Sequence, residues 1–119
     1  MSESKVEELV RKVKTKTFSF KIGDKRWIAH AEAFLTEIED GITPSRLASR
    51  LKYTIELTLK VLEFLKDENI IEYEGELSPD TKIRLTEVGR KVKEKIVEEK
   101  RKAVETFAEA LGAGFFEEG

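Results

Sequence analysis

The hydrophobic residues of this chain recur at intervals of three and four positions in several stretches, which is the spacing of an amphipathic helix. The first stretch places four of them on one helical face: Val6, Leu9, Val10 and Val13. This spacing predicts helices over residues 4–16, 26–39, 44–51, 55–68 and 87–111. After the first helix, Phe18, Phe20 and Ile22 alternate with polar residues, so a short strand is predicted there, followed by a turn at Gly23-Asp24.

Residues that favour helix ends support these boundaries. Thr43 is suited to cap the helix that starts at Pro44, because proline is well tolerated at the first helical position. Thr54 is suited to cap the next helix, and Asn69 can adopt the left-handed conformation that ends it. Glycines are expected to end two other helices, at Gly41 and at Gly112 and Gly114.

Two short apolar runs after Asn69 predict the strands of a hairpin. Residues 70–73 and 82–86 contain β-branched residues, and turn-forming residues lie between them at Gly75, Ser78 and Pro79. The predicted order after residue 43 is therefore a short helix, a tight turn, a longer helix and a β-hairpin.

The composition excludes several kinds of site. The 119 residues include no Cys and one His, which removes disulfides, thiolate zinc sites, thiol nucleophiles and most His-based metal sites and catalytic triads. The glycines are scattered rather than gathered in a phosphate-binding loop. We therefore expect a binding protein with no catalytic residues, no metal and no cofactor.

The hydropathy of the chain bears on its location. No apolar run approaches the roughly 18–20 residues of a membrane span, and the N-terminus lacks the apolar segment of a signal peptide. A cytoplasmic protein without membrane contact is expected. Charged residues make up 39% of the chain, and its richness in Lys and Glu suits a thermophilic, archaeal source.

The charges are grouped along the chain, although the 22 basic and 24 acidic residues nearly cancel to a net charge of −2. Residues 5–26 hold eight bases and three acids, and residues 43–52 hold three bases and no acid. Residues 56–80, in contrast, hold eight acids and two bases. Such blocks form either an interaction surface or a solvated surface of ion pairs.

Motifs in this order resemble the winged helix-turn-helix regulators of the MarR, ArsR and PadR type. The matching residues are Leu47-Ala48 and Leu51, then Leu62, Leu65, Ile70 and Ile71, then LTEVGR at 85–90. The resemblance covers residues 27–95. It implies a mostly α fold with a small β-hairpin wing, here with an N-terminal extension and a long C-terminal helix. It also implies a sequence-specific double-stranded DNA-binding transcriptional regulator that acts as a homodimer.

The resemblance assigns roles to the central helices. The helix over residues 55–68 would enter the DNA major groove, and the helix over residues 44–51 would cross the backbone. Candidate phosphate contacts are Ser45, Arg46, Ser49, Arg50, Lys52, Tyr53 and Thr54. Candidate base and wing contacts are Glu56, Lys60, Lys82 and Arg84. Alternatively, Arg46 and Arg50 pair with the acids of residues 32–40.

The predicted recognition helix and wing depart from this pattern in their charge. The polar stripe of the helix carries one base and three acids: Lys60, Glu56, Glu63 and Asp67. Four more acids surround the tip of the wing: Glu72, Glu74, Glu76 and Asp80. Because carboxylates repel phosphates, the alternative is a winged helix that serves as a protein-interaction or assembly module for an unidentified basic protein.

The apolar face of the same helix, which includes Leu57 and Phe64, needs a cover. The candidates within the chain are Phe18, Phe20 and Ile22, and a second subunit is the alternative. The aromatic residues that alternate with bases in this segment, Trp27 among them, are either core residues or nucleic-acid contacts.

These predictions divide the chain into four parts. They are an N-terminal helix and basic extension (1–26), the winged helix-turn-helix domain (27–86), a C-terminal dimerisation helix (87–111) and a flexible tail (112–119). The resemblance implies a dimer that uses the last helix together with the N-terminal helix over residues 4–16. The interface residues on the last helix are Val88, Val92, Ile96, Ala103, Phe107 and Leu111. The alternative is that this helix packs back on its own domain.

Overall fold

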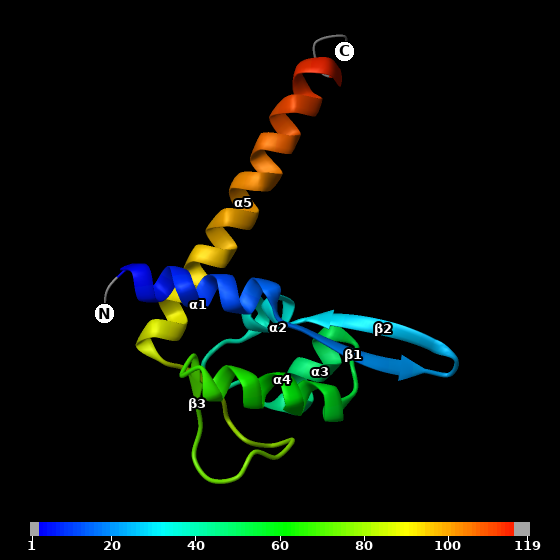
Figure 1. Cartoon of the computed structure of the whole chain (residues 1–119), viewed down its shortest axis with the longest axis vertical. Coiled ribbons are helices and arrows are strands. Elements are labelled where there is room, and N and C mark those ends of the chain that lie inside the picture. The colour runs from blue at the N-terminus through cyan, green and yellow to red at the C-terminus, as the bar shows by residue number, and fades with distance from the viewer. Residues whose placement is uncertain (1–2, 116–119) are drawn as a thin grey trace.

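The computed structural model describes the backbone of residues 3–115 and the side chains of residues 4–107. Five helices and four strands form within these residues (Figure 1). In chain order they are α1 (Glu3–Thr15), β1 (Thr17–Ile22), β2 (Lys25–His30), α2 (Ala31–Glu37), α3 (Pro44–Leu51), α4 (Ile55–Asp67), β3 (Ile71–Glu72), β4 (Arg84–Leu85) and α5 (Glu87–Phe115). The expectation of a mostly α fold with a small β-hairpin wing is confirmed.

The core lies where α1, α2, α4 and the first turns of α5 meet. Its fully buried side chains include Val13, Phe34, Leu62, Leu65 and Val92. Two parts of the chain extend away from this core, the β1–β2 hairpin and the C-terminal half of α5 (Figure 1). Ion pairs tie α1 to its neighbours, because the ammonium of Lys14 lies 2.6 Å from Glu99 and that of Lys12 lies 3.0 Å from Glu68.

The predicted helix-turn-helix forms with the predicted caps. The Thr43 side chain accepts a hydrogen bond from the backbone N–H of Arg46 at 3.2 Å, and Pro44 occupies the first turn of α3. Lys52 adopts a left-handed conformation with φ of 61°, which turns the chain sharply toward α4. Thr54 then caps α4 by accepting from the N–H of Leu57 at 3.2 Å. Asn69 is left-handed, as predicted.

The predicted wing hairpin is also present, with shorter strands than expected. Its antiparallel register pairs Ile71 with Leu85 and Glu72 with Arg84. An isolated bridge pairs Ile42 with Ile83, so the segment before α3 is held against the wing.

A close backbone approach joins the wing to α5. The Thr86 hydroxyl donates to the carbonyl of Asn69 at 2.7 Å and accepts from the N–H of Gly89 at 2.9 Å. A Cβ placed on Gly89 would lie 1.9 Å from the carbonyl oxygen of Ile70, so only glycine fits there. The LTEVGR motif therefore forms the joint between the end of α4, β3 and α5.

The structure corrects the helix predicted over residues 26–39. Residues 25–30 form β2, which pairs with all six residues of β1, and helical structure starts only at Ala31. The two-residue turn has Gly23 at φ of 62°, a conformation that suits a tight hairpin and that glycine adopts without strain. The predicted boundary between residues 26 and 27 consequently falls inside β2.

The structure also corrects the end of the last helix. Helix α5 continues through Gly112 and Gly114 to Phe115, so the first four residues of the predicted tail are helical. A glycine inside a helix costs only about 1 kcal/mol relative to alanine. The predicted tail residues 116–119 lie outside the described residues.

No helix within residues 3–115 combines the length and the hydrophobicity that a membrane span requires. Among the same residues, no group of three or more His, Cys, Asp or Glu side chains could hold a metal ion.

The Gly89 contact predicts a large loss of stability on a minimal substitution. Gly89→Ala should lower the free energy of unfolding by roughly 1–3 kcal/mol or more, because the new methyl group would overlap the Ile70 carbonyl. Urea denaturation followed by circular dichroism measures this change, with Glu94→Ala on the exposed face of α5 as the control. Equal midpoints for the two variants would contradict the proposed close contact.

Candidate nucleic-acid interface

The outer face of α3 and the turn after it bring together most of the predicted phosphate contacts. Six of the seven side chains are exposed: Ser45, Arg46, Ser49, Arg50, Lys52 and Thr54. The α3–α4 turn adds Lys52 to this face through its left-handed backbone. None of the ion pairs formed within the described residues involves Arg46 or Lys52, so both charges remain available to an external anion.

Arg50 is held by an acid of the preceding loop. Its guanidinium donates to the carboxylate of Glu39 at 2.9 Å. This hydrogen bond, together with the positive charge of Arg50, lowers the pKa of Glu39. The alternative expectation, pairing with the acids of residues 32–40, is therefore confirmed for Arg50, while Arg46 contributes only a weaker long-range attraction to Glu39.

Tyr53, the seventh candidate, belongs to an aromatic cluster. Its half-buried ring stacks on Phe34, with centroids 5.3 Å apart and an interplanar angle of 19°. Phe20 of β1 contacts the same ring edge-on, with centroids 5.6 Å apart. The Tyr53 ring thus links the helix-turn-helix to the β1–β2 hairpin, and any contact with phosphate would fall to its hydroxyl.

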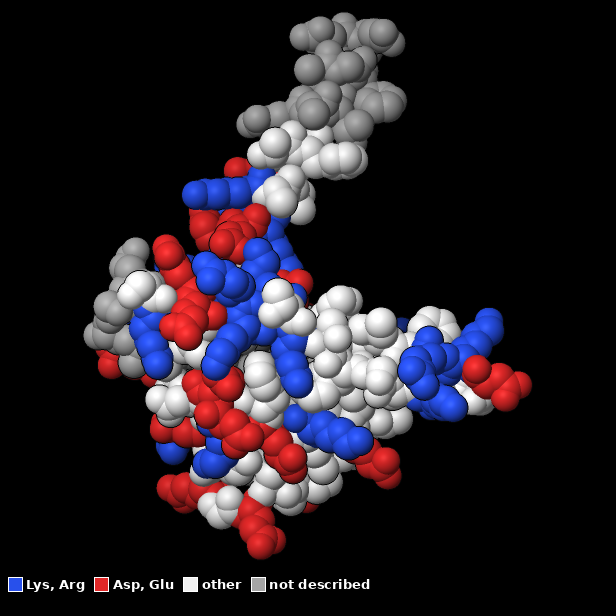
Figure 2. All heavy atoms as spheres, in the orientation of Figure 1, with Lys and Arg blue, Asp and Glu red and all other residues white. Residues whose placement is uncertain are grey.

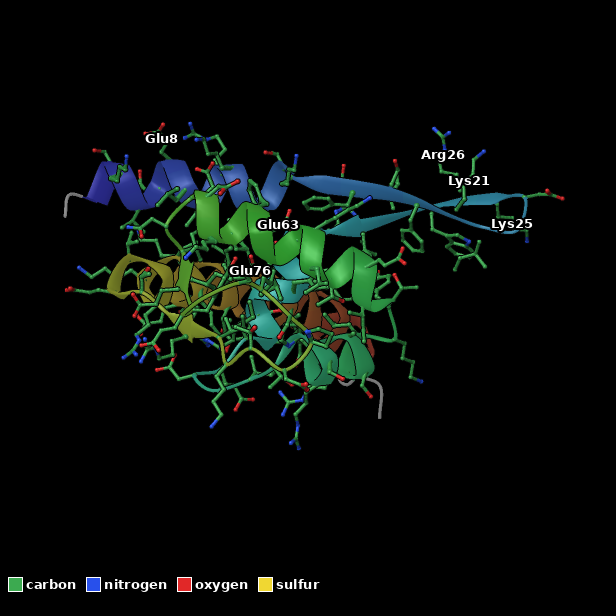
Figure 3. All side chains as sticks on the ribbon, turned by 90° about the horizontal axis from the view of Figure 1, so that it is seen from below. Glu8, Lys21, Lys25, Arg26, Glu63 and Glu76 are labelled. Carbon is green, nitrogen blue, oxygen red and sulfur yellow. The ribbon has the colours of Figure 1, made fainter. Side chains whose placement is uncertain are left out.

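The exposed face of α4 is acidic, as its sequence indicates. Glu56, Lys60, Glu63 and Asp67 are all exposed. Burial raises the pKa of Tyr73 at the base of the wing, and the negative charges of Glu63 and Asp67 raise it further. Acidic side chains form a band on the body in Figure 2, and Figure 3 places Glu63 and Glu76 on the body, apart from the labelled bases of the hairpin. This helix face would repel a phosphate backbone.

The two bases of the wing lie beside acids. Lys82 and Arg84 line a hollow of about 540 Å³ together with Asp40 and Glu74. Arg84 also lies 3.9 Å from the carboxylate of Glu72 on the paired strand. The positive charge of Arg84 is therefore partly compensated within the chain, whereas no ion pair within the described residues includes Lys82.

The β1–β2 hairpin forms part of the basic surface, and the sequence predicted only its first strand. Its register pairs Thr17 with His30 and Ile22 with Lys25, so β2 brings Lys25, Arg26 and Trp27 beside β1. A signal was present, since Gly23-Asp24 directly after an alternating segment is typical of a hairpin turn.

The predicted cover of α4 is partly confirmed. Phe18 meets Phe64 edge-on, with ring centroids 6.2 Å apart, a geometry that contributes about 0.5–1.5 kcal/mol beyond the burial of surface. Phe20 packs on Tyr53 rather than on α4. Ile22 was expected to join them, but its position beyond the body leaves it 61% exposed, so that expectation was wrong.

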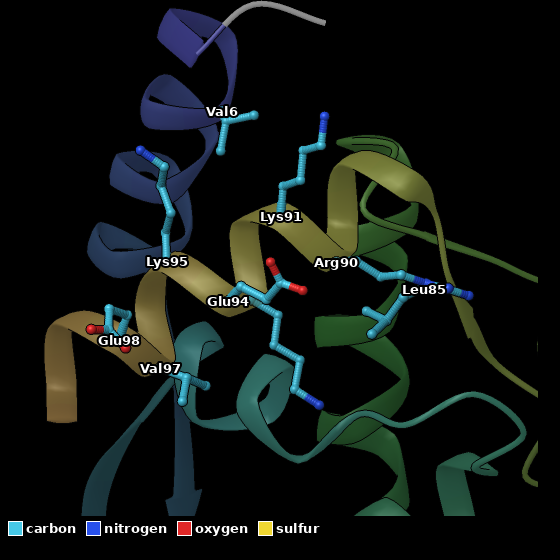
Figure 4. A pocket seen from close by; sticks show the side chains of 9 residues that line it. Val6, Leu85, Arg90, Lys91, Glu94, Lys95, Val97 and Glu98 are labelled. Atoms are coloured by element: carbon cyan, nitrogen blue, oxygen red, sulfur yellow. The ribbon is translucent and has the colours of Figure 1, made fainter.

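A shallow groove of about 940 Å³ runs along α5 (Figure 4). Val6 of α1, Leu85 of β4 and Val97 of α5 give it three apolar side chains. The other lining residues are charged and of both signs: Arg90, Lys91, Lys93, Glu94, Lys95 and Glu98. Such a lining offers no concentrated charge of one sign to a ligand.

The predicted dimer residues fall into two groups. Val88, Val92 and Ile96 are buried in the core of the single chain, so they have no surface to offer a second copy. Ala103 and Phe107 are exposed on the part of α5 that leaves the body, and the side chain of Leu111 lies outside the described residues. Over its first three turns, α5 thus packs its apolar stripe against the core of its own chain.

No family model matches the chain, and no curated protein matches it. Solved structures with a similar fold include the transcriptional regulator SlyA, with 20% identity and a TM-score of 0.57 over 66% of this chain. Another is the multiple antibiotic-resistance repressor MarR from Listeria monocytogenes, with 22% identity and a TM-score of 0.53 over 74% of this chain. The chain spans 58% of the SlyA chain and 64% of the MarR chain.

A third similar structure is Lactococcus lactis ZitR in complex with DNA, with 19% identity and a TM-score of 0.60. This match covers 99% of the chain and 88% of ZitR. At these identities the likeness establishes the fold, which is the winged helix-turn-helix fold of MarR-type regulators.

The Arg50–Glu39 pair predicts a measurable pKa change. Arg50→Gln should raise the pKa of Glu39 toward its ordinary value, because the lowering depends first on the hydrogen bond from Arg50. Titration of the side-chain carboxyl carbon by NMR measures this pKa. Arg84→Gln, which removes a base from a different ion pair, should leave the Glu39 titration in place. A Glu39 titration that Arg50→Gln does not move would show that the pair is absent in solution.

Proposed function

We propose that this protein is a transcriptional regulator that binds double-stranded DNA with sequence specificity as a homodimer. The single observation that carries the proposal is the exposed basic face of a helix-turn-helix, formed by Arg46 and Lys52 on a winged-helix fold. The ZitR structure of the same fold is a complex with DNA, which supports this ligand class.

The charges on this surface suggest which residues bind phosphates and which bind bases. Arg46, Lys52 and the hydroxyls of Ser45, Ser49 and Thr54 would bind phosphates beside the α3–α4 turn. Lys60 is the donor on α4 suited to a guanine edge, and Glu56 could accept from a cytosine amine. Because α4 is acidic elsewhere, affinity would come mainly from α3 and the turn.

The proposed dimer uses the projecting part of α5. Val97, Val104 and Phe107 lie on one stripe of this helix, and Val104 and Phe107 are 67% and 65% exposed. A helix with such a stripe beyond its own core is suited to pack against the same helix of a second copy. Two copies would then present two helix-turn-helix units to one duplex.

The acidic face of α4 and the acidic wing favour a second candidate function, a winged helix that binds a basic protein instead of DNA. If this candidate is correct, the protein does not bind duplex DNA even at low salt. The following experiment therefore separates the two functions.

Removal of two phosphate contacts should weaken DNA binding in a sequence-independent way. Arg46→Ala with Lys52→Ala should reduce affinity for all duplexes alike. For the dimer it should also reduce the slope of log affinity against log salt by about 3.6, since two contacts are lost in each copy and each contributes about 0.9. Fluorescence anisotropy with labelled duplexes over a salt series measures both quantities.

Lys91→Ala with Lys102→Ala is the matched control, because it removes two exposed bases from α5. An equal loss in the control would refute the role of the α3 face. Failure of the unmodified protein to bind duplex at tens of micromolar and low salt would favour the protein-binding candidate.

The dimer proposal predicts a change of mass on a surface substitution. Phe107→Glu with Val104→Asp should convert a dimer of twice 13.7 kDa into a monomer, because four charges would face one another across the seam. Sedimentation equilibrium measures the mass. Lys102→Glu on the same helix should leave the dimer intact, and a monomeric mass for the unmodified protein at micromolar concentration would overturn the proposal.

A further inference from the structure

The β1–β2 hairpin consists of an anchored half and a free half. Phe18 and Phe20 pack against Phe64 and Tyr53, which fixes the half near the body. The outer half extends past the body, where Ile22, Trp27 and Ile28 are 61%, 48% and 58% exposed (Figure 1). We call this outer half, residues 21–28, the arm.

The arm carries unpaired positive charge. It contains Lys21, Lys25 and Arg26 against the single acid Asp24, and all four side chains are exposed. The hairpin register places Lys21 directly opposite Arg26, and Figure 3 shows both side chains on the same side of the ribbon. Lys25 points to the other side (Figure 3).

This placement of like charges costs stability. Residues directly opposite each other in an antiparallel pair have Cβ atoms roughly 4.5–5.5 Å apart, and like charges there are destabilising. Lys12 and Lys14 of α1 have carboxylate partners, whereas no ion pair within the described residues includes a base of the arm. An external polyanion would remove the repulsion between Lys21 and Arg26.

The root of the arm adjoins the surface proposed to bind DNA. Phe20 contacts Tyr53, and Tyr53 stands between Lys52 and Thr54 in the α3–α4 turn. A duplex bound at this turn would pass the hairpin. The six residues of β1 span about 20 Å, and the outer third of this length, Lys21 and Ile22, carries the turn and its bases beyond the anchored half, toward phosphates that the helix-turn-helix leaves free.

We propose that the arm is a second DNA-binding element, which grips the phosphates of the duplex beside the segment bound by α3 and α4. Lys21 and Arg26 bind phosphates from one face of the ribbon and Lys25 from the other. A two-stranded ribbon is also narrow enough to enter the major groove, so Trp27 and Ile28 come close to the duplex. This inference rests on the proposed DNA-binding function and adds contacts that the helix-turn-helix does not supply.

The chain provides its own reporter for the arm. Trp27 is the only tryptophan, so its fluorescence reports on the arm without any label. The protein is titrated at about 50 mM salt with a mixed-sequence duplex about three helical turns long. Binding of the arm should change the intensity and the emission maximum of Trp27, with the same midpoint as an anisotropy titration of the labelled duplex.

The charge variant is Lys21→Gln with Lys25→Gln and Arg26→Gln. It should bind the duplex about tenfold more weakly or worse. The salt slope of the dimer should fall by about 5.4, because three contacts are lost in each copy and each contributes about 0.9. Its fold should be intact, because all three side chains are exposed, and circular dichroism verifies this. The matched control replaces three exposed bases elsewhere: Lys5→Gln, Lys91→Gln and Lys102→Gln.

The outcomes separate the two proposals. If the unmodified protein binds DNA but the arm variant matches the control and Trp27 does not respond, the arm proposal is overturned while the proposed function stands. If neither protein binds duplex DNA, both proposals fall. A Trp27 response to anionic vesicles that equals the response to DNA, or one that follows protein concentration without DNA, would assign the arm to a membrane or to a second copy and overturn its role on DNA.

Discussion

The approach of α5 to the Ile70 carbonyl is the contact on which the arrangement of the other elements depends. Gly89 permits this approach, and the Thr86 hydroxyl secures it by bonding the end of α4 and the first turn of α5. Asp40 reinforces the same place, because its carboxylate accepts from the N–H of Leu85 at 2.9 Å and from Arg90 at 2.6 Å. Helix α4, the wing and the loop before α3 are therefore fixed relative to α5 at one joint.

The electrostatic pattern of the molecule follows from which charges are compensated. Arg84 of the wing and Arg50 face carboxylates, whereas Arg46, Lys52 and the arm keep their positive charge. Since α4 is acidic, a duplex would approach with its phosphates over α3 and the hairpin and away from Glu63 and Asp67. The near-zero net charge conceals this separation, which depends on where the chain folds each block.

The sequence predicted what is decided locally. The caps at Thr43 and Thr54 and the left-handed Asn69 depend on a few neighbouring residues, and all three predictions were confirmed. The strand β2 was missed because Trp27, Ala31 and Phe34 have helical spacing even though Trp27 lies in a strand. The stripe on α5 was predicted as a dimer interface, but Val88, Val92 and Ile96 pack in the core of their own chain, which was the alternative. The sequence does not separate the two, since an apolar stripe has the same spacing whether it packs on its own chain or on another. For Arg50 the sequence left two alternatives open, a phosphate contact or an ion pair with an acid of residues 32–40. The choice depends on how the loop before α3 folds, and the structure pairs Arg50 with Glu39.

The hairpin is closed at its root by a hydrogen bond from the N–H of Ala31 to the carbonyl of Lys16, 3.1 Å long. Helices α1 and α2 consequently meet at this point whatever the length of the strands beyond it. Insertions or deletions of one residue in each strand would keep the pairing and move only the tip, and shifts of two would also keep each side chain on its face. The reach and charge of the tip can therefore vary during evolution without disturbing the core. Phe18 and Phe20 cannot vary in this way, because they pack against the body.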